Sequence, residues 1–299
     1  MSHLYPIKDS FGKLHADVLP NTFILAIGDF MINQLIPAFF LSSSVASLAF
    51  WRGSLSKSGV VGALLVGTLI FGLGGWFWGI LLGIFFISSS LLSHFKEAEK
   101  QQAAEKFEKG HRRDFGQAMA NGGTGAIIAL LNVLLPSPAW FFMFTGAMAT
   151  VTADTWATEL GTLSESPPRL ITTGEVVEVG TSGGVSLLGT AVSTLAGLII
   201  GLAAGLFSKK SVWKLSFIGA LSGLAGSLCD SLLGATIQQI FYCDTCEKDT
   251  ERKIHKCGTE TRQIRGYSWL NNDMVNLLAS LVGGIVAILL WLLLRNKNE

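Results

Sequence analysis

Eight stretches of mostly apolar residues run along the chain, each long enough to be a candidate for a helical membrane crossing. One crossing needs about 20 consecutive apolar residues, because the hydrocarbon core is ~30 Å thick and a helix rises ~1.5 Å per residue. Turn signals separate neighbouring stretches, notably Gly74–Gly75 and Pro136-Ser-Pro138. The pattern predicts spans at residues 22–41, 59–75, 76–94, 117–135, 139–160, 185–207, 214–242 and 275–294.

The first span is the least regular of the eight. Pro37 lies inside it, Asp29 is a lone acid without an assigned role, and Ser42–Trp51 could form a separate short helix. The spans fill roughly half of the chain and leave no room for a large soluble domain. We therefore predict an all-α, polytopic membrane protein forming one integral-membrane domain over 1–299, with about eight transmembrane helices in a range of six to nine.

Composition supports this fold class. Charged residues make up only 14% of the chain and hydrophobic residues 49%, whereas a soluble domain usually carries about 25% charged residues. This balance excludes a soluble Rossmann enzyme, a disordered chain and a disulfide-stapled secreted domain. The net charge of +1 provides no basic field for nucleic acid. The first 20 residues are polar and mixed, so no cleavable signal peptide is expected.

Orientation is predicted from the Lys and Arg residues of the loops, which are in excess on the cytoplasmic side of membrane proteins. Of the 22 Lys and Arg residues, 15 fall on the side of the three long loops and seven on the other. The loops 95–116, 161–184 and 243–272 should therefore face the cytoplasm. With eight spans both termini lie outside, although a divided first span would move the N-terminus inside.

The loop 95–116 is rich in Ala, Glu, Gln and Lys, which favour helices. It is predicted to be a cytosolic helical extension of the third span. The charges from Lys96 to Lys109 are interpreted as a solvated helix face. Arg113 differs from them, because it stands where the chain re-enters the membrane.

Several ionisable residues interrupt the apolar spans, where they are costly and usually mark function. Asp154 and Thr158 are four residues apart and share a helix face, whereas Glu159 is rotated by about 140° from Asp154. Asp230 interrupts another span made of small residues. Further polar residues in or beside spans are Asn121, Gln238, Asp273 and Asn276, and the last two begin the final span.

Two of these segments resemble each other, since Asp154-Thr155 and Asp230-Ser231 each follow a stretch rich in Gly, Ala and Ser. Small residues allow helices to approach closely. Two such helices would bring the carboxylates of Asp154 and Asp230 together as a Mg²⁺ site, because Mg²⁺ prefers hard oxygen ligands. The alternative is that these polar residues hydrogen-bond between helices, which we prefer for Asn276 and Gln238.

The loop 161–184 is a candidate phosphate-binding loop. It contains Arg169 and ends in Thr181, Ser182, Gly183 and Gly184 at the entry to the sixth span. Glycines let backbone amides approach an anion, hydroxyls add donors, and a guanidinium is a fork for phosphate. The loop is not a Walker motif, because no Gly-Lys-Ser/Thr follows. A helix cap with a turn is the simpler alternative.

Six ordered motifs together resemble a known family. They read RRDFGQAMANGG, ADTWATELG, PRLITTG, VGTSGGVS, CDSLLGATIQ and WLNNDMVN. From about residue 54 to 293 the chain is similar to the integral-membrane family (domain of unknown function ninety-two) that contains phytyl-phosphate kinase and transmembrane protein nineteen. The resemblance implies transfer of a phosphoryl group from a nucleoside triphosphate to an isoprenyl monophosphate. The family also resembles, distantly, the CTP-dependent polyprenol kinases and the phosphatidate cytidylyltransferases.

This resemblance suggests roles for the candidate residues in a largely electrostatic mechanism. Asp154 and Asp230 would hold Mg²⁺, with Glu159 and Asp273 as further ligands. Arg169 and the Thr181–Gly184 loop would bind the phosphates of the nucleotide, for which CTP is favoured. Arg113 would contact the phosphate of the isoprenyl acceptor, and its apolar tail would lie between glycine-rich helices. Asn121 and Asp273 are further candidates for binding the co-substrate.

A second candidate metal site lies in the loop 243–272. Cys243, Cys246, His255 and Cys257 form a CxxC-x8-HxC pattern that could close a tetrahedral zinc site, although its spacing departs from common zinc fingers. Reduced thiols without a metal and a redox pair are the alternatives. A stable disulfide is disfavoured in a reducing cytosol. The fourth cysteine, Cys229, lies in a span and is interpreted as a packing residue.

Three functions compete for this sequence. A membrane lipid kinase, in a plasma or thylakoid-type membrane with its active site facing the cytoplasm, would concentrate polar residues at one face. An ion-coupled transporter would place its carboxylates near the bilayer midplane in both halves. Asp230 is interpreted as lying deeper in the membrane than the other acids, which favours that alternative. A cytidylyltransferase acting on a lipid phosphate would use the same metal and phosphate groups. The oligomeric state is not predicted.

Overall fold

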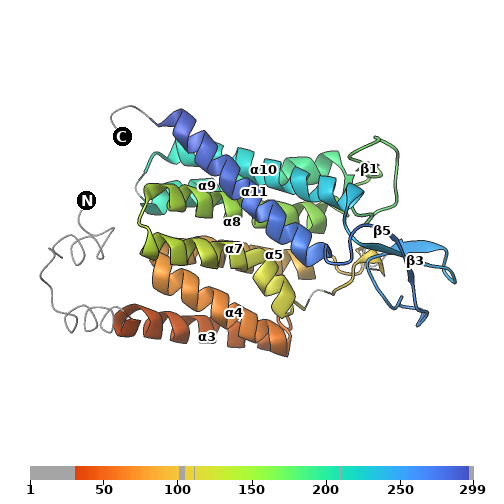
Figure 1. Cartoon of the computed structure of the whole chain (residues 1–299), viewed down its shortest axis with the longest axis horizontal. Helices are drawn as coiled ribbons and strands as arrows, with labels where there is room; N and C mark the ends of the chain where they lie inside the picture. The colour runs from red at the N-terminus through yellow and green to blue at the C-terminus, as the bar shows by residue number, and fades with distance from the viewer. Residues whose placement is uncertain (1–30, 101–104, 111, 209, 296–299) are drawn as a thin grey trace, which may run out of the picture.

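The computed structural model describes residues 31–100, 105–110, 112–208 and 210–295. Its main feature is a bundle of eight long helices that alternate in direction (Figure 1). In chain order these are α3 (Ile36–Trp51), α4 (Lys57–Leu69), α5 (Trp76–His94), α7 (Phe115–Leu134), α8 (Pro138–Gly161), α9 (Leu187–Ser208), α10 (Val212–Thr236) and α11 (Asn272–Leu294). The π-helical turns η1 (Met31–Leu35) and η2 (Ile70–Gly74) adjoin α3 and α4.

The turn signals end helices where they were predicted to. Gly75, with φ of +82°, separates η2 from α5, a left-handed conformation that glycine adopts without strain. Ser137 caps α8, whose first residue is Pro138. Asp114 and Gln117 form a reciprocal capping box at the start of α7. Seven of the eight helices therefore lie close to the predicted spans.

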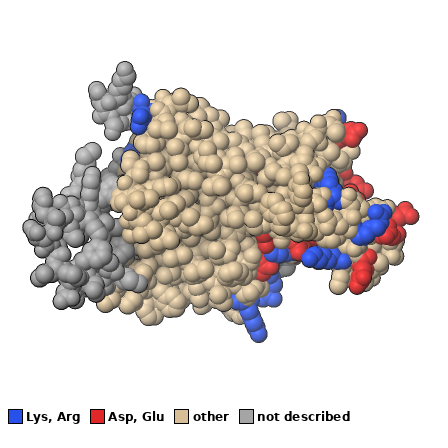
Figure 2. All heavy atoms as spheres, viewed as in Figure 1, with Lys and Arg blue, Asp and Glu red and all other residues tan. Residues whose placement is uncertain are grey.

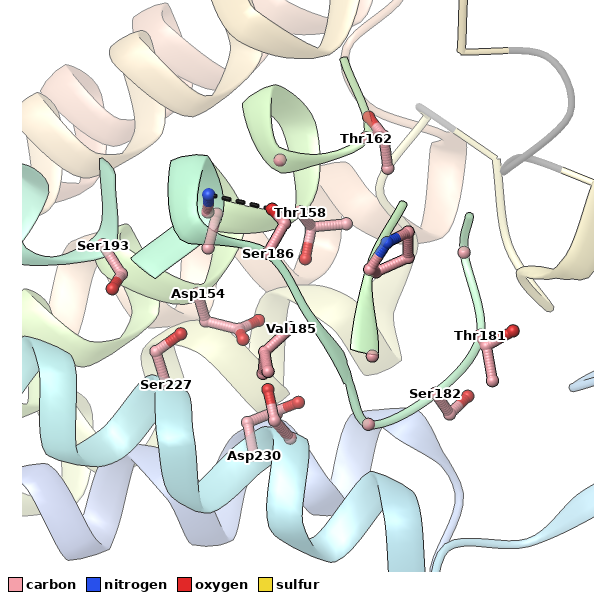
Figure 3. Close-up of a pocket in the computed structure, with 18 of the residues that line it drawn as sticks. Asp154, Thr158, Thr162, Thr181, Ser182, Val185, Ser186, Ser193, Ser227 and Asp230 are labelled. Atoms are coloured by element: carbon pink, nitrogen blue, oxygen red, sulfur yellow. Dashed lines mark hydrogen bonds between the residues drawn. The ribbon is translucent and has the colours of Figure 1, made fainter. Parts of the chain in front are cut away.

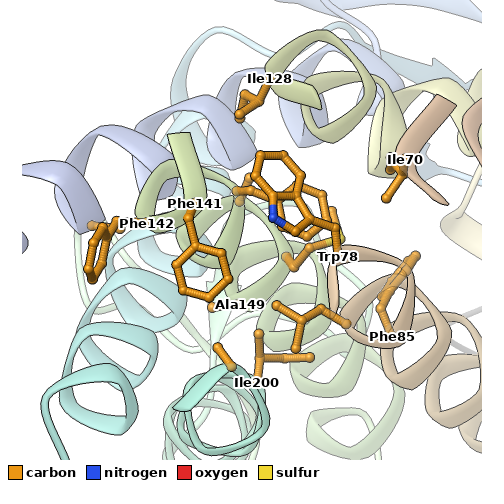
Figure 4. Packing of buried hydrophobic residues seen from close by; sticks show 14 of the residues in the cluster. Ile70, Trp78, Phe85, Ile128, Phe141, Phe142, Ala149 and Ile200 are labelled. Carbon is orange, nitrogen blue, oxygen red and sulfur yellow. The ribbon is translucent and has the colours of Figure 1, made fainter. Parts of the chain in front are cut away.

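Six of the long helices in the described part of the chain are apolar and long enough to cross a membrane. The other two, α7 and α8, carry more polar and small residues. Helix α8 is the centre of the bundle, since every residue from Phe141 to Ala153 except Met143 is buried. Around it, Trp78 stacks on Phe144 with ring centroids 4.3 Å apart, in an apolar core that Figure 4 shows.

Helices α9 and α10 pack closely against each other through small residues. Each carries a GxxxG pattern, with Gly197 and Gly201 on α9 and Gly219 and Gly223 on α10. A β-carbon at Gly197 would overlap the backbone oxygen of Gly219, and the reverse is also true. Only glycine permits this approach, which fixes how α10 and its carboxylate sit against the core.

Three details of the predicted elements were wrong. The first helical span runs over Ile32–Trp51 rather than 22–41, so Ser42–Trp51 belongs to it; Asp29 and residues 22–30 lie outside the described residues. Helix α10 ends at Thr236, because the chain then enters β3 (Ile240–Cys243). The predicted helical extension of the third span does not continue α5, since Phe95 is extended and Lys96 has φ of +51°.

Small β-structures stand at one end of the bundle, in addition to the predicted helices. Strand β3 is flanked by β4 (Lys248–Thr250) and β5 (Arg262–Arg265), both antiparallel to it. In the loop before α9, β1 (Arg169–Leu170) pairs with β2 (Gly184–Val185). Figure 1 shows both sheets at the same end, whereas α3 begins and α11 finishes at the other.

Charged side chains gather mainly at this end. On the face that Figure 2 shows, they surround the strands, and a broad belt without charge covers the middle of the bundle. The three long loops also contact one another here: Lys106 of the first donates to Thr181 of the second at 3.0 Å, and Ser182 donates to Glu251 of the third at 2.9 Å. The loops predicted to share one side of the membrane thus share one end of the molecule.

We predict that this end faces the cytoplasm, as the excess of Lys and Arg indicates. Glu175 is exposed in the second loop, so a cysteine introduced there should resist an impermeant thiol reagent in intact cells and react after permeabilisation. The other four cysteines are replaced by serine in the background. Strong labelling at position 175 in sealed cells would show that this end of the molecule faces the outside, contrary to the prediction.

Candidate active site

Three helices bring polar side chains together near the end that carries the strands. Asp154 comes from α8, Asp230 from α10 and Asn276 from α11. With its amide nitrogen turned towards the carboxylates, Asn276 donates to Asp230 Oδ2 at 2.8 Å and to Asp154 Oδ2 at 3.2 Å. One amide group therefore touches both acids, and the two carboxylates lie close together, as their sequence pattern predicted.

The two carboxylates lie at a similar depth. Asp154 is seven residues before the end of α8 at Gly161, and Asp230 is six before the end of α10 at Thr236. At ~1.5 Å per residue, each lies about 10 Å inside its helix end. The interpretation of Asp230 as the deeper residue was therefore wrong, and the pair belongs to one end of the bundle.

A cavity of about 130 Å³ opens beside the carboxylate pair. Figure 3 shows Asp154 and Asp230 on one side and the loop with Thr181 and Ser182 on the other. Thr158 also lines this cavity, which agrees with its predicted position on the same face of α8 as Asp154. Small and hydroxylated residues of α8, α9 and α10 make up much of the remaining wall, and Phe107, Pro168 and Leu228 contribute apolar surface.

The loop is held against α10 at Gly183. This residue has φ of +86°, and a β-carbon on it would lie 2.5 Å from the β-carbon of Ala235. Glycine is therefore required both by conformation and by space. Thr181 accepts from Lys106, and Ser182 donates to Glu251. The predicted loop thus borders the cavity, and both of these hydroxyl side chains are hydrogen-bonded to the other two long loops.

Arg169 is not where a phosphate ligand was expected. Its side chain is exposed, does not line the cavity, and donates from Nη1 to the backbone oxygen of Gly174 at 2.8 Å. The neighbouring Pro168 reaches the cavity instead. Pro168 directly precedes β1, and successive residues of an extended chain point to opposite sides. Arg169 closes its own hairpin.

A second cavity of about 530 Å³ meets the first at Asp154 and Asp230, which line both. Arg113 lies in its wall with 9% of its surface exposed. The guanidinium lies over the rings of Phe85 and Phe86, donates to Ser90 Oγ at 2.8 Å, and forms no salt bridge with a carboxylate that the structure describes. Burial lowers the pKa of Arg113 to about 10, so it stays charged at neutral pH.

Glu159 and Asp273, predicted as further metal ligands, are each paired with a lysine in the second cavity. Glu159 lines the second cavity but not the first, accepts from Ser93 Oγ at 2.7 Å and pairs with Lys100. Asp273 pairs with Lys109, which also lies 3.0 Å from Asp114. Asn121 lines the same cavity and donates to the backbone oxygen of Gln117.

For two lysines of the first loop the predicted exposure to solvent was wrong. Lys100 and Lys109 were interpreted as part of a solvated helix face, but Lys100 is only 8% exposed and both line the second cavity. Burial lowers and the bonds to Asp273 and Asp114 raise the pKa of Lys109, with a net rise. The loop turns back under the bundle after Phe95, and this fold-back leaves no periodic signal in the sequence.

Glu251 is a buried residue of this region that sequence analysis missed. Its Oε1 accepts from Ser182 and, at 2.7 Å, from Gln238 Nε2, and its Oε2 accepts from the backbone nitrogen of Glu108 at 3.3 Å. Burial raises the pKa of Glu251, although these hydrogen bonds oppose the rise. Gln238 was predicted to tie helices together; it ties α10 to the third loop through Glu251.

The predicted cysteine and histidine cluster is assembled beyond the strands. Ligand atoms from Cys243, Cys246, His255 and Cys257 all lie within 4.8 Å of one another. All four cysteines of the chain are free thiols. Cys229 is half-buried in α10, apart from this cluster.

Comparison with known proteins identifies relatives across most of the chain. It is 33% identical over 273 residues to Protein PGR of Arabidopsis thaliana, covering 83% of this chain and 93% of that protein. It is 34% identical over 238 residues to the uncharacterized membrane protein MJ0933 of Methanocaldococcus jannaschii, covering 79% and 86%.

Protein VTE6, chloroplastic, of Arabidopsis thaliana is 27% identical over 241 residues, covering 79% of this chain and 65% of that protein. No solved structure matches the chain. The family described as integral membrane protein DUF92 matches residues 37–284, which confirms the family that the six motifs predicted. The chain therefore belongs to the DUF92 family of integral membrane proteins.

Proposed function

We propose that this protein is a Mg²⁺-dependent membrane kinase. It would transfer a phosphoryl group from a nucleoside triphosphate, with CTP favoured, to an isoprenyl monophosphate such as phytyl or geranylgeranyl phosphate. The observation that carries the proposal is the pair Asp154 and Asp230 at the junction of two cavities. Two phosphorylated substrates need two compartments and one shared site of charge neutralisation.

The donor set at this junction suits Mg²⁺. Two carboxylates lie close together, and the reverse orientation of the Asn276 amide would present its oxygen beside them. Hard oxygen ligands with room for phosphate oxygens are what Mg²⁺ requires. When bound, the ion would neutralise charge on the transferred phosphoryl group. Without a cation, two adjacent carboxylates repel each other, so the site as built favours one.

The linings of the cavities suggest which substrate each receives. The first is walled by backbone and hydroxyl groups of the Gly180–Gly184 loop, which suit the phosphate chain of a nucleotide. In the second, Lys100 and Lys109 are already paired with acids, whereas Arg113 is free of such pairing among the described carboxylates. A buried guanidinium with unused donors suits the monophosphate of the lipid.

The reaction needs little covalent chemistry from the chain. An oxygen of the isoprenyl monophosphate attacks the γ-phosphorus, the bond from that phosphorus to the β,γ-bridging oxygen breaks, and the products are an isoprenyl diphosphate and a nucleoside diphosphate. A phosphate monoester is already a competent nucleophile, so no general base is required. The residues of this chain would bind, orient and neutralise charge.

The similarity to VTE6 and the motif resemblance to phytyl-phosphate kinases support this substrate class. A transporter would hold its carboxylates near the midplane, but each acid lies about 10 Å from the end of its own helix, and both are at the same end of the bundle. A cytidylyltransferase remains a second candidate, because its metal and phosphate groups would be the same.

One assay tests the proposal against both alternatives. Purified protein in detergent is incubated with Mg²⁺, a nucleoside triphosphate, and phytyl, geranylgeranyl or farnesyl monophosphate, and the products are resolved by mass. An isoprenyl diphosphate formed together with CDP supports the kinase. A CDP-lipid with pyrophosphate identifies a cytidylyltransferase, and no product with any nucleotide contradicts both enzymes.

The role of Arg113 is a separate prediction. Replacing it with alanine should raise the apparent KM for the isoprenyl phosphate about 10- to 100-fold, since hydrogen bonds to charged groups contribute about 1.5–3 kcal/mol. The KM for the nucleotide should change little. Arg113→Lys should recover only part of the affinity, because lysine lacks the guanidinium fork.

Arg112→Ala is the matched control, because Arg112 is the neighbouring exposed arginine and lines neither cavity. It should leave both KM values unchanged. If Arg113→Ala lowers kcat and thermal stability without affecting the KM for the lipid, Arg113 only supports the fold at the start of α7.

A further inference from the structure

We infer that Cys243, Cys246, His255 and Cys257 bind a structural zinc ion that holds Glu251 in the wall of the second cavity. The inference is independent of the proposed kinase reaction, because it rests on a cluster beyond the membrane-spanning bundle. Three sulfur atoms and one imidazole nitrogen, all within 4.8 Å of one another, form the donor set. Zinc favours such soft, four-coordinate sites.

The distances between donors fit one small ion. Cys243 and Cys257 have their sulfur atoms 3.6 Å apart, and His255 Nδ1 lies 3.2 Å from the sulfur of Cys257. In a tetrahedral site with Zn–S bonds of ~2.3 Å, neighbouring sulfurs are about 3.8 Å apart. The observed separation is far longer than a disulfide bond of ~2.05 Å. The thiols therefore converge as they would around a cation.

Two tight turns present the ligands in pairs. In the first, the backbone nitrogen of Glu247 donates to the oxygen of Cys243 at 2.8 Å, and Glu247 itself has φ of +54°. In the second, Gly258, with φ of +88°, donates to the oxygen of His255 at 2.9 Å. Glu247 is not a glycine, so its left-handed conformation is strained by about 1–2 kcal/mol. Binding of a metal by both turns explains why that strain is retained.

The metal site would fix the path of the chain that leads to Glu251. Cys243 ends β3 and pairs with Lys248 at the start of β4, and Glu251 directly follows β4. Glu251 then accepts hydrogen bonds from Ser182 of the glycine-rich loop and Gln238 at the end of α10. A hairpin this short has little apolar core of its own, so its order depends on the ligand cluster. Loss of zinc should therefore loosen the segment from Cys243 to Arg265.

Metal content tests the site directly. Protein purified in detergent and passed through buffer containing EDTA should retain about one zinc per chain, measured by plasma mass spectrometry. Cys243→Ser combined with Cys257→Ser should remove it, and Cys229→Ser is the matched control that should retain it. Wild-type protein without stoichiometric zinc, or zinc retained by the double variant, would overturn the inference.

A second measurement covers the case in which the double variant does not fold. Wild-type protein should be cut by trypsin at Lys248, Lys253 and Lys256 about tenfold faster after zinc is removed with a strong chelator, because cleavage follows local opening. Re-addition of zinc should restore resistance. Equal cleavage rates with and without the chelator would contradict the structural role. Neither measurement involves nucleotide turnover, so failure of the kinase proposal would leave both readouts unaffected.

Discussion

Asp154→Asn should lower the rate of phosphoryl transfer by about 10²–10³-fold or more, the size expected when a preorganised electrostatic group is lost from a catalytic site. Asparagine keeps the shape of the side chain but removes the charge that would hold Mg²⁺. Asp230→Asn should act similarly. The double variant should be little worse than either single one, because residues that act as one unit are not additive. The measurement is initial rate at saturating nucleotide and isoprenyl phosphate.

The controls distinguish a metal site from a carboxylate pair that only holds two helices together. Glu165→Gln makes a comparable change in an exposed acid that lines neither cavity, and it should leave the rate unchanged. A thermal melt in detergent shows whether each variant still folds. If Asp154→Asn and Asp230→Asn melt at lower temperature but keep near wild-type activity per folded molecule, the pair only ties α8 to α10, and the metal site must be sought at Glu159 and Asp273.

The helices and the carboxylate pair were predictable because their signals are local. Runs of apolar residues and the turn at Pro136-Ser-Pro138 set the spans. The similar contexts of Asp154 and Asp230, each among small residues, indicated that two helices would approach closely there. The close contacts of Gly223 with Ala149 and of Gly226 with Thr150 bear out that approach between α10 and α8.

The wall of the second cavity was not predictable, because it depends on how the loop after α5 folds back. Lys100 reaches Glu159 across 59 positions of the chain, and Lys109 reaches Asp273 across 164. Neither pair produces a periodic pattern in the sequence. The loop is rich in residues that favour helices, so the turn at Lys96 was not predicted. Glu251 was not predicted for a similar reason: it follows a short strand in a loop, and its contacts with Ser182 and Gln238 depend on how that loop folds.

Gly183→Ala should weaken the interaction with the nucleotide. Alanine at φ of +86° is strained by about 1 kcal/mol, and its β-carbon would lie 2.5 Å from that of Ala235, an overlap that costs typically 1–3 kcal/mol in a packed region. Because α10 cannot yield without moving Asp230, the loop should shift away from the cavity. We expect kcat/KM for the nucleotide to fall by about 30-fold or more, since 1.4 kcal/mol corresponds to tenfold.

Gly174 provides a control that isolates the overlap from the backbone strain. It has φ of +74° in the same loop, but a β-carbon there would meet no atom within 4 Å. Gly174→Ala should therefore carry only the strain and leave kcat/KM for the nucleotide within a few-fold of wild type. Ala235→Gly would not rescue Gly183→Ala, because the added β-carbon would also lie 2.6 Å from the backbone Cα and nitrogen of Ala235. Equal effects of the two alanine substitutions would show that the packing of the loop against α10 does not determine the affinity for nucleotide.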